Sequence, residues 1–277
     1  MYKTLLFFVA LLVAVCCSPG IQAQKEYAKM TFNDEFAGKA GAAVDVSKWT
    51  AEIGGKGWGN QELQYYTNST ENAFLDGAGN LVIKVAKLTP PLKLECWYGP
   101  CQYTSARLIT KGKFEQKYGT FEARIKIPRG QGMWSAFWML GNDIDKVSWP
   151  QCGEIDIMEN IGKEPKTVHG TIHGPGYAGD KGIGAASGLS KNQTFADDFH
   201  VYSTEWSENK IRFFVDGKRY KTITPTDLPP GTKWVYDHPF FLLLNFAIGG
   251  PWGGNPGATS VFPQEMVIDY VRVYEHR

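Results

Sequence analysis

Three acidic side chains within six residues are the part of the sequence best suited to chemistry. Glu154, Asp156 and Glu159 lie in the segment GEIDIMEN, among apolar neighbours. Burying carboxylates costs free energy, so a segment that keeps three of them in such company is typical of a site that uses them. Two carboxyl groups that flank a glycosidic bond can divide its hydrolysis. One attacks the anomeric carbon, and the other, held protonated, donates its proton to the leaving oxygen.

The three acids share one face only if this segment is a strand with an irregularity. Residues two apart point the same way on a strand, so Glu154 and Asp156 project together while the intervening isoleucines point into the core. Glu159 lies five positions after Glu154 and would face the core on a regular strand. A β-bulge near Met158 would return it to the acidic face. The alternative is a solvated polar face on an ordinary edge strand.

Acids drawn from a single strand are expected to lie close together. Repulsion between like charges then raises at least one of their pKa values, as an acid catalyst near neutral pH requires. An inverting enzyme leaves roughly 6.5–9.5 Å between its carboxyl groups for a water molecule, whereas a retaining enzyme brings them nearer. The arrangement therefore favours retention, with the third acid holding the nucleophile in orientation.

The remaining chain has the periodicity of strands. Apolar and charged side chains alternate in FEARIKIP (121–128), and FFLLLNFAIGG (240–250) predicts a fully buried strand. Residues 199–224 predict three strands, with a tight hairpin turn at Asp216 and Gly217, and 267–276 predict a terminal strand. Helical stretches are limited to single turns near 44–50 and 225–230. We therefore expect an all-β sandwich of two antiparallel sheets.

Residues 1–23 differ from the rest and predict a secretory signal peptide. Lys3 precedes an apolar run, and small and polar residues follow it. An uncleaved membrane anchor is the alternative. Residues 24–277 contain no linker, repeat or low-complexity tract, so we expect them to form a single domain. The mature protein is predicted to be secreted or periplasmic.

Charge and composition exclude several partners. Removing Lys3 from the 29 basic residues leaves 28, which balance 28 acidic residues. A neutral chain is not drawn to nucleic acid or to anionic lipid, so neither is expected as a partner after signal cleavage. Aromatic residues make up 14% of the chain, which favours an uncharged ligand such as a sugar. Of the three cysteines after residue 23, export allows a bridge between Cys96 and Cys101, with Cys152 left over.

The acidic segment resembles the active-site strand of glycoside hydrolase family 16, laminarinase type. WPQCGEIDIMENIG, WGNQELQYYT, YGTFEARIKIPRGQGMWSAFWMLG, GTIHGPGY and LLLNFAIGGPWGG all follow the family's order. The resemblance implies a β-jelly-roll of two curved antiparallel sheets with a substrate cleft on the concave face. It also implies retention, with Glu154 as nucleophile, Asp156 as its assisting acid and Glu159 as general acid/base.

The same resemblance implies a set of substrate-binding residues. Glu62 is expected to brace their loop, and Trp206 is expected in the core. The alternatives are a core position for Trp138, a surface ion pair for Arg107 and a loop-stabilising hydrogen bond for His173. The residues implied to bind substrate are Trp58, Asn60, Arg107, Trp134, Trp138, His173 and Trp252.

No cofactor is implied for catalysis, but the family resemblance implies a structural calcium ion on the convex side. Asp269, with Glu35 or neighbouring carbonyl oxygens, could supply the hard oxygen ligands that calcium prefers. An ordinary strand aspartate is the alternative interpretation of Asp269.

Together these patterns predict an exported, monomeric endo-β-1,3-glucanase. Its substrates would be laminarin-like polymers, with mixed-linkage β-1,3-1,4-glucans as further candidates. Three alternatives stay open at the level of sequence: a non-catalytic glucan-binding module, a transglycosylase, and a relative that cleaves agarose.

Overall fold

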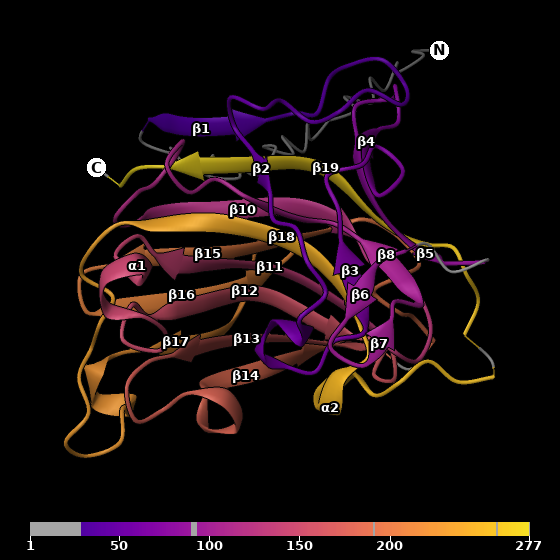
Figure 1. The fold of residues 1–277 in the computed structure, drawn as a ribbon. Coiled ribbons are helices and arrows are strands. Elements are labelled where there is room, and N and C mark those ends of the chain that lie inside the picture. Colours follow the sequence, from indigo (N-terminus) through magenta and orange to yellow (C-terminus); the bar gives the residue numbers. More distant parts are fainter. Residues whose placement is uncertain (1–28, 90–92, 191, 259, 277) are drawn as a thin grey trace, which may run out of the picture.

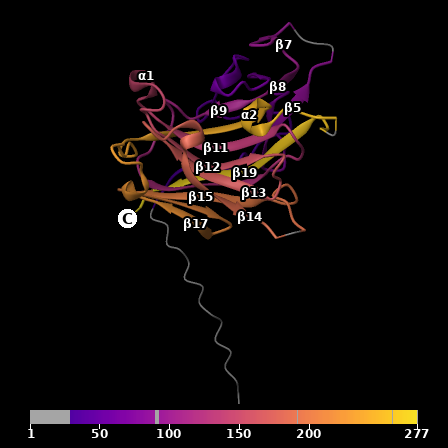
Figure 2. The same cartoon turned by 90° about the horizontal axis from the view of Figure 1, so that it is seen from below.

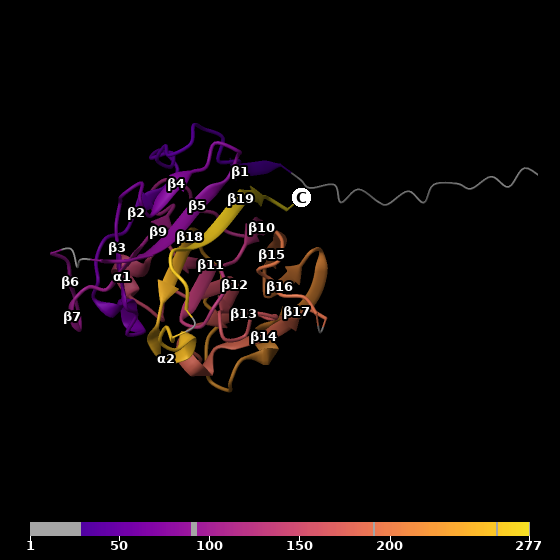
Figure 3. The same ribbon diagram turned by 90° about the vertical axis from the view of Figure 1, so that its right-hand side faces the viewer.

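The computed structural model describes residues 29–89, 93–190, 192–258 and 260–276. The predicted signal peptide, residues 1–23, lies outside these ranges. Within them, two large β-sheets pack face to face, and their strands form two curved layers in end-on view (Figure 3). The predicted all-β sandwich of jelly-roll type is confirmed.

The larger sheet joins segments from across the described chain (Figure 1). Off its main path, β1 (Met30–Asp34) pairs with β19 (Gln264–Tyr274), and β4 (Ala73–Leu75) pairs with β5 (Leu81–Lys87). In spatial order its main path is β17 (Lys218–Ile223), β16 (Lys210–Val215), β15 (His200–Ser207), β10 (Gly119–Lys126), β19 (Gln264–Tyr274), β5 (Leu81–Lys87), β8 (Tyr103–Ser105) and β3 (Gln64–Tyr66), with β1 (Met30–Asp34) and β4 (Ala73–Leu75) beside it.

The second sheet carries the acidic segment near its middle. In spatial order it consists of β14 (Ile183–Gly188), β13 (Thr167–His173), β12 (Glu154–Ile161), β11 (Met133–Gly141), β18 (Phe240–Ile248), β9 (Arg107–Ile109) and β2 (Thr50–Ala51). A small hairpin stands apart, formed by β6 (Glu95–Cys96) and β7 (Gly99–Pro100).

Helices are short throughout the described ranges. The two α-helices are α1 (Ile144–Val147) and α2 (Gly250–Gly253), and single 3-10 turns span Gly57–Gly59, Gly179–Lys181 and Pro225–Asp227. Figures 1 and 2 place α1 and α2 at opposite ends of the strands. Among the described residues, no helix is long and apolar enough to cross a bilayer.

The core lies between the two sheets and follows the predicted alternation. Phe121, Ala123 and Ile125 of β10 are fully buried, and every residue of β18 is buried. Trp206 is also fully buried, as expected. Because alternate residues of each strand enter this core, the opposite face of the second sheet is left for polar and aromatic side chains.

The predicted hairpins form, with one departure in strand direction. Asp216 and Gly217 both adopt positive φ and join β16 to β17. β3, however, runs parallel to β8, whereas the sequence predicted antiparallel sheets throughout. The long connection between these strands, which includes β4 and β5, allows the parallel pairing.

The cysteines adopt the arrangement that export would allow. Cys96 and Cys101 form a disulfide that closes the β6–β7 hairpin, and Cys152 is a buried free thiol. The bridge fixes a surface loop that has few strand hydrogen bonds of its own.

The two carboxylates suggested for calcium each face an arginine. Glu35 accepts two hydrogen bonds of 2.8 Å from Arg272, and Asp269 accepts one of 2.6 Å from Arg124. Both oxygens of Glu35 and one oxygen of Asp269 are thus engaged by guanidinium groups, so of these two carboxylates only the second Asp269 oxygen is left for a calcium ion. The structural calcium stays a prediction, and its ligands would have to come chiefly from backbone carbonyl oxygens.

Candidate active site

A bulge in β12 places the three acids on one face of the second sheet. Asp156 pairs with Thr171 of β13, whereas Glu159, three residues on, pairs with His169, only two residues away. The register against β11 slips at the same place, so that Ile157 is the extra residue. Ile157 and its neighbour Met158 are both buried in the core, and Glu159 turns back to the acidic face. The predicted bulge is therefore present.

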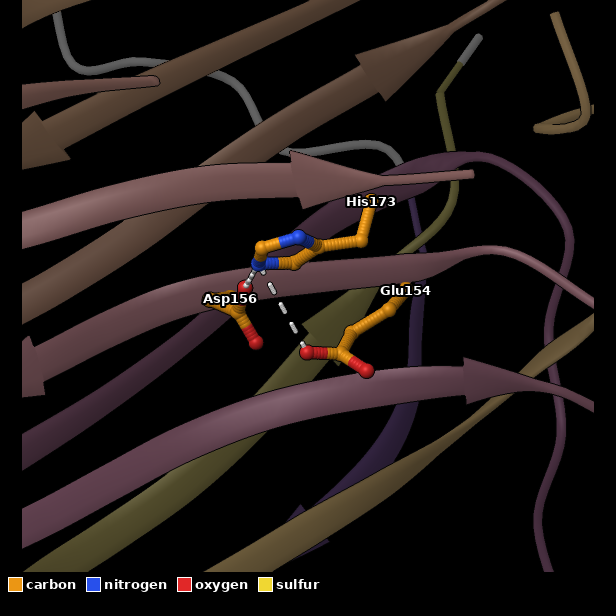
Figure 4. Close-up of side chains that lie close together, drawn as sticks. All are labelled: Glu154, Asp156 and His173. Carbon is orange, nitrogen blue, oxygen red and sulfur yellow. Dashed lines mark ion pairs between the residues drawn. The ribbon is translucent and has the colours of Figure 1, made fainter. Parts of the chain in front are cut away.

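The first two acids share a histidine, and Glu154 also contacts a tryptophan. His173 Nε2 lies 3.1 Å from Asp156 Oδ2 and 3.8 Å from Glu154 Oε1, as Figure 4 shows. The indole of Trp149 donates a hydrogen bond of 2.7 Å to Glu154 Oε2. Tyr236 donates its hydroxyl proton to the backbone oxygen of His173 and so anchors that strand end. One oxygen of the Glu154 carboxylate is thus fixed by a hydrogen bond, and the other lies near the His173 ring.

Glu159 is held by a separate aromatic group. Trp134, on the neighbouring strand β11, donates its indole N–H to Glu159 Oε1 at 3.0 Å. The Trp134 ring meets Trp252 edge to face at 5.2 Å, and Trp252 meets His169 in the same way. These rings fix one carboxyl oxygen of Glu159 and leave the other for a proton.

A second aromatic group surrounds Arg107. Its guanidinium lies 4.8 Å from the ring centres of both Trp58 and Trp138, a distance typical of cation–π contacts. Arg107 also pairs with Glu52. Arg107 therefore forms the ion pair that was the alternative interpretation, and it also lies in the site.

Trp138 joins this group to a buried polar network. Its indole donates to Asn245 Oδ1 at 2.6 Å, and the Asn245 amide donates to the hydroxyl of Tyr66 at 3.1 Å. Tyr66 in turn donates to Glu62. The half-buried Trp138 is thus a polar-anchored ring on the site face and not a core residue.

Glu62 ties the loop of Asn60 to the sheet. It accepts hydrogen bonds from Gln64 at 2.6 Å and, with a longer contact of 3.4 Å, from Asn60. Burial raises the pKa of Glu62, and the surrounding donors satisfy its oxygens. It braces the loop, as expected, while the Asn60 side chain stays beside the site.

Burial and mutual repulsion raise the pKa of all three acids. Burial, followed by the charge of Asp156, raises the pKa of Glu154 to about 8. Burial, followed by the charge of Glu154, raises the pKa of Glu159 to about 7. Burial, followed by the charge of Glu159, raises the pKa of Asp156 well above its usual range. The site therefore keeps carboxyl protons at neutral pH.

The donors around each acid indicate where those protons reside. The negative charge of Asp156 raises the pKa of Glu154, so ionising one of these two acids opposes ionising the other. Asp156 is the more deeply buried of the two, with 3% of its side chain exposed against 16% for Glu154. Glu154 also receives the Trp149 N–H, which favours its ionised form. Because ionising one acid of the cluster keeps the others protonated, we assign the single negative charge to Glu154, which receives the Trp149 N–H, and a proton to the more deeply buried Asp156.

These raised pKa values predict a stability that falls as the pH rises. The pKa of Glu159 is 4.5 unfolded and about 7 folded, so the folded protein binds more protons between these values. Charging Glu159 then costs about 3 kcal/mol of folding free energy. The variant Glu159→Gln should match the wild type near pH 4.5 and exceed it at pH 8. Urea unfolding at both pH values measures this, and an equal difference at both would contradict it.

One further arrangement of these residues is compatible with metal binding. The ligand atoms of Glu154, Asp156 and His173 lie within 4.8 Å of one another. Two of these side chains already contact each other, with His173 Nε2 3.1 Å from Asp156 Oδ2, and the proton chemistry above uses the same three residues.

Sequence reasoning missed several residues of the site. Trp149 lies five residues before Glu154 in an exposed turn, and only the folded structure reveals its hydrogen bond. Asn245 had a visible signal, because it is the one polar residue within the apolar run of β18. His169 was also missed, although its strand already contained the predicted His173. All seven predicted binding residues, by contrast, lie on or beside the acidic face.

Comparisons with known proteins agree with this geometry. The model of Glycosyl hydrolases family 16 matches residues 59–272. The Beta-glucanase of Rhodothermus marinus is 43% identical over 89% of this chain and 85% of its own length. The Glucan endo-1,3-beta-glucosidase A1 of Niallia circulans is 38% identical over 90% of this chain but 38% of its own length. The laminarinase catalytic domain from Thermotoga maritima MSB8 has a TM-score of 0.84 and 47% identity, covering 91% of this chain and 100% of that domain.

Proposed function

Since the chain belongs to glycosyl hydrolases family 16, we propose that it cleaves internal β-1,3-glucosidic bonds of laminarin-like glucans with retention of configuration. The observation that carries the proposal is the bulge in β12, which brings Glu154, Asp156 and Glu159 to one face. The relatives named above as endo-1,3-beta-glucosidase and laminarinase support the linkage.

The first half of the reaction forms a covalent glycosyl-enzyme. Glu154 attacks the anomeric carbon while Glu159 donates its proton to the departing glycosidic oxygen. Trp149 donates a hydrogen bond to the attacking carboxylate, and His173 and protonated Asp156 lie beside it. Because Glu154 and Glu159 are each fixed by an indole N–H, little reorganisation is needed as charge moves between them.

The second half returns the enzyme to its starting state. Glu159, now ionised, takes a proton from water, which attacks the anomeric carbon on the face that the leaving group vacated. Two inversions give net retention. The Glu154 carboxylate is released, and Glu159 is again protonated for the next cycle.

The substrate is tested most directly by comparing polymers. Incubation with laminarin, curdlan, lichenan and agarose, with product sizes resolved over time, should show early internal cleavage of the β-1,3-glucans. Lichenan would be cut if mixed linkages are accepted, as in a β-1,3(4)-glucanase. Cleavage of agarose alone would overturn the proposed linkage.

A non-catalytic glucan-binding module and a transglycosylase are the competing functions. Pure binding would not require three acids held with raised pKa values, and all three are present and oriented. Transfer to a sugar instead of water uses the same intermediate, so it is an extension of the mechanism. Product analysis at high oligosaccharide concentration separates transfer from hydrolysis.

We also propose that the protein is exported and that residues 1–23 are removed. The disulfide between Cys96 and Cys101 supports an oxidising compartment, because such bridges are rare in a reducing cytosol. Cell fractionation with N-terminal sequencing tests this. A cytosolic protein that retains Lys3 would contradict it.

A further inference from the structure

A pocket of about 340 Å³ lies beside the acidic face, against the β6–β7 hairpin, and the reaction described above does not use it. Its volume is at the lower end for small-ligand sites. None of the side chains that line it is charged, which favours an uncharged ligand. Its walls include Gln61, Leu63, Trp97, Gly250, Pro251 and Asn255.

Trp97 offers the pocket a fixed aromatic surface. The side chain is 49% exposed. Its indole N–H nevertheless donates to the backbone oxygen of Glu62 at 2.8 Å, and its backbone N–H donates to the backbone oxygen of Gly55 at 2.9 Å. The ring also packs against Gly57, where a β-carbon would lie only 3.0 Å away. A large ring held this firmly while half exposed can stack on the C–H face of a sugar with little loss of side-chain entropy.

The hairpin that carries Trp97 is fastened to the loop of the binding residues. The Cys96–Cys101 disulfide closes it, and the hydroxyl of Tyr98 donates to the Leu63 oxygen at 2.6 Å. The facing loop holds two non-glycine residues, Trp58 and Gln61, at φ values of 49° and 52°. Backbone in this region is costly and is retained chiefly where a site requires it.

The pocket borders on the active site at α2. Gly250 forms part of the pocket wall, and a β-carbon there would lie 2.6 Å from the Asn60 oxygen and 3.6 Å from the Trp134 ring. The same helix carries Trp252, which contacts Trp134. Figures 1 and 3 place α2 and the β6–β7 hairpin at the same end of the strands. A polymer bound across the three acids would therefore reach this pocket at the end of the site that α2 borders.

We propose that this pocket is an additional binding subsite for a glucosyl unit of the polymer, with Trp97 as its stacking surface and Gln61 and Asn255 as its polar partners. The inference rests on the proposed glucanase function and adds a requirement on chain length. Long glucans would gain affinity from the subsite, whereas short oligosaccharides that fill only the positions nearest the acids would not.

The test compares Trp97→Ala with the wild type on laminarin and on laminaritriose. We expect KM for laminarin to rise about fivefold to tenfold, with kcat within about twofold, because the contact lies away from the reacting bond. Both parameters for laminaritriose should stay unchanged. Trp97→Phe should restore most of the affinity because it keeps a ring, and Val261→Ala, an exposed residue outside the pocket, serves as the control.

A second variant tests the subsite even if Trp97→Ala fails to fold. Asn255→Ala removes a polar partner without disturbing the packing of Trp97, and should raise KM for laminarin alone by about twofold to threefold. Equal effects on polymer and trisaccharide, or no effect of Trp97→Ala on either, would overturn the subsite. A wild-type protein that cleaves no β-1,3-glucan would instead overturn the proposed function and the subsite with it.

Discussion

Glu154→Gln should lower turnover of laminarin by more than about 10⁴-fold, because the amide cannot attack the anomeric carbon and no covalent intermediate forms. Glutamine keeps the size of the side chain and an oxygen that can accept the Trp149 N–H. The fold and the aromatic surfaces should therefore persist. Reducing-sugar release measures the loss.

Binding separates a lost nucleophile from a damaged site. Calorimetry should show that Glu154→Gln still binds laminarin oligosaccharides. Its affinity should lie within about threefold of the wild-type affinity for the same substrate. Glu265→Gln, on β19 in the other sheet, is the matched control and should retain full activity. Turnover within tenfold of wild type in Glu154→Gln would remove that residue from its role.

Glu159→Gln should produce a loss that depends on the leaving group. Hydrolysis of laminarin, whose leaving alcohol needs a proton, should fall by about 10²–10⁴-fold. Formation of the intermediate from dinitrophenyl β-laminaribioside should continue at close to the wild-type rate, because dinitrophenolate departs without a proton. Pre-steady-state release of dinitrophenol measures this step, and azide should speed the second step by replacing the activated water.

The same variant should change the pH profile. In the wild type, activity should fall as the pH rises through about 7, since Glu159 then loses the proton that it donates. With the dinitrophenyl substrate, Glu159→Gln should lack this basic limb for intermediate formation. An equal loss on both substrates, with the limb intact, would show that the proton comes from another group.

The main layers of the fold follow from local sequence patterns. Alternation in β10 and the apolar run of β18 specify which side chains enter the core, and that pattern requires no knowledge of distant contacts. The bulge was predictable for a similar reason. Five positions separate Glu154 from Glu159, and only an inserted residue allows both to avoid the core.

Contacts between distant segments were not predictable in the same way. The hydrogen bond from Trp149 depends on how the turn before β12 folds over the sheet. The parallel pairing of β3 with β8 depends on the path of the chain between them. The arginine partners of Glu35 and Asp269, which are Arg272 and Arg124, were not predictable either. Residue type alone does not determine which cross-strand partner a carboxylate finds.

The anomeric configuration of the first product tests the central claim most directly. If Glu154 and Glu159 act from one strand through a covalent intermediate, a proton NMR time course of laminarin hydrolysis should show the β-anomer first. The α-anomer should then grow in at the rate of mutarotation. Appearance of the α-anomer first would mean direct attack by water, and would contradict the two-step mechanism that the bulged strand is proposed to support.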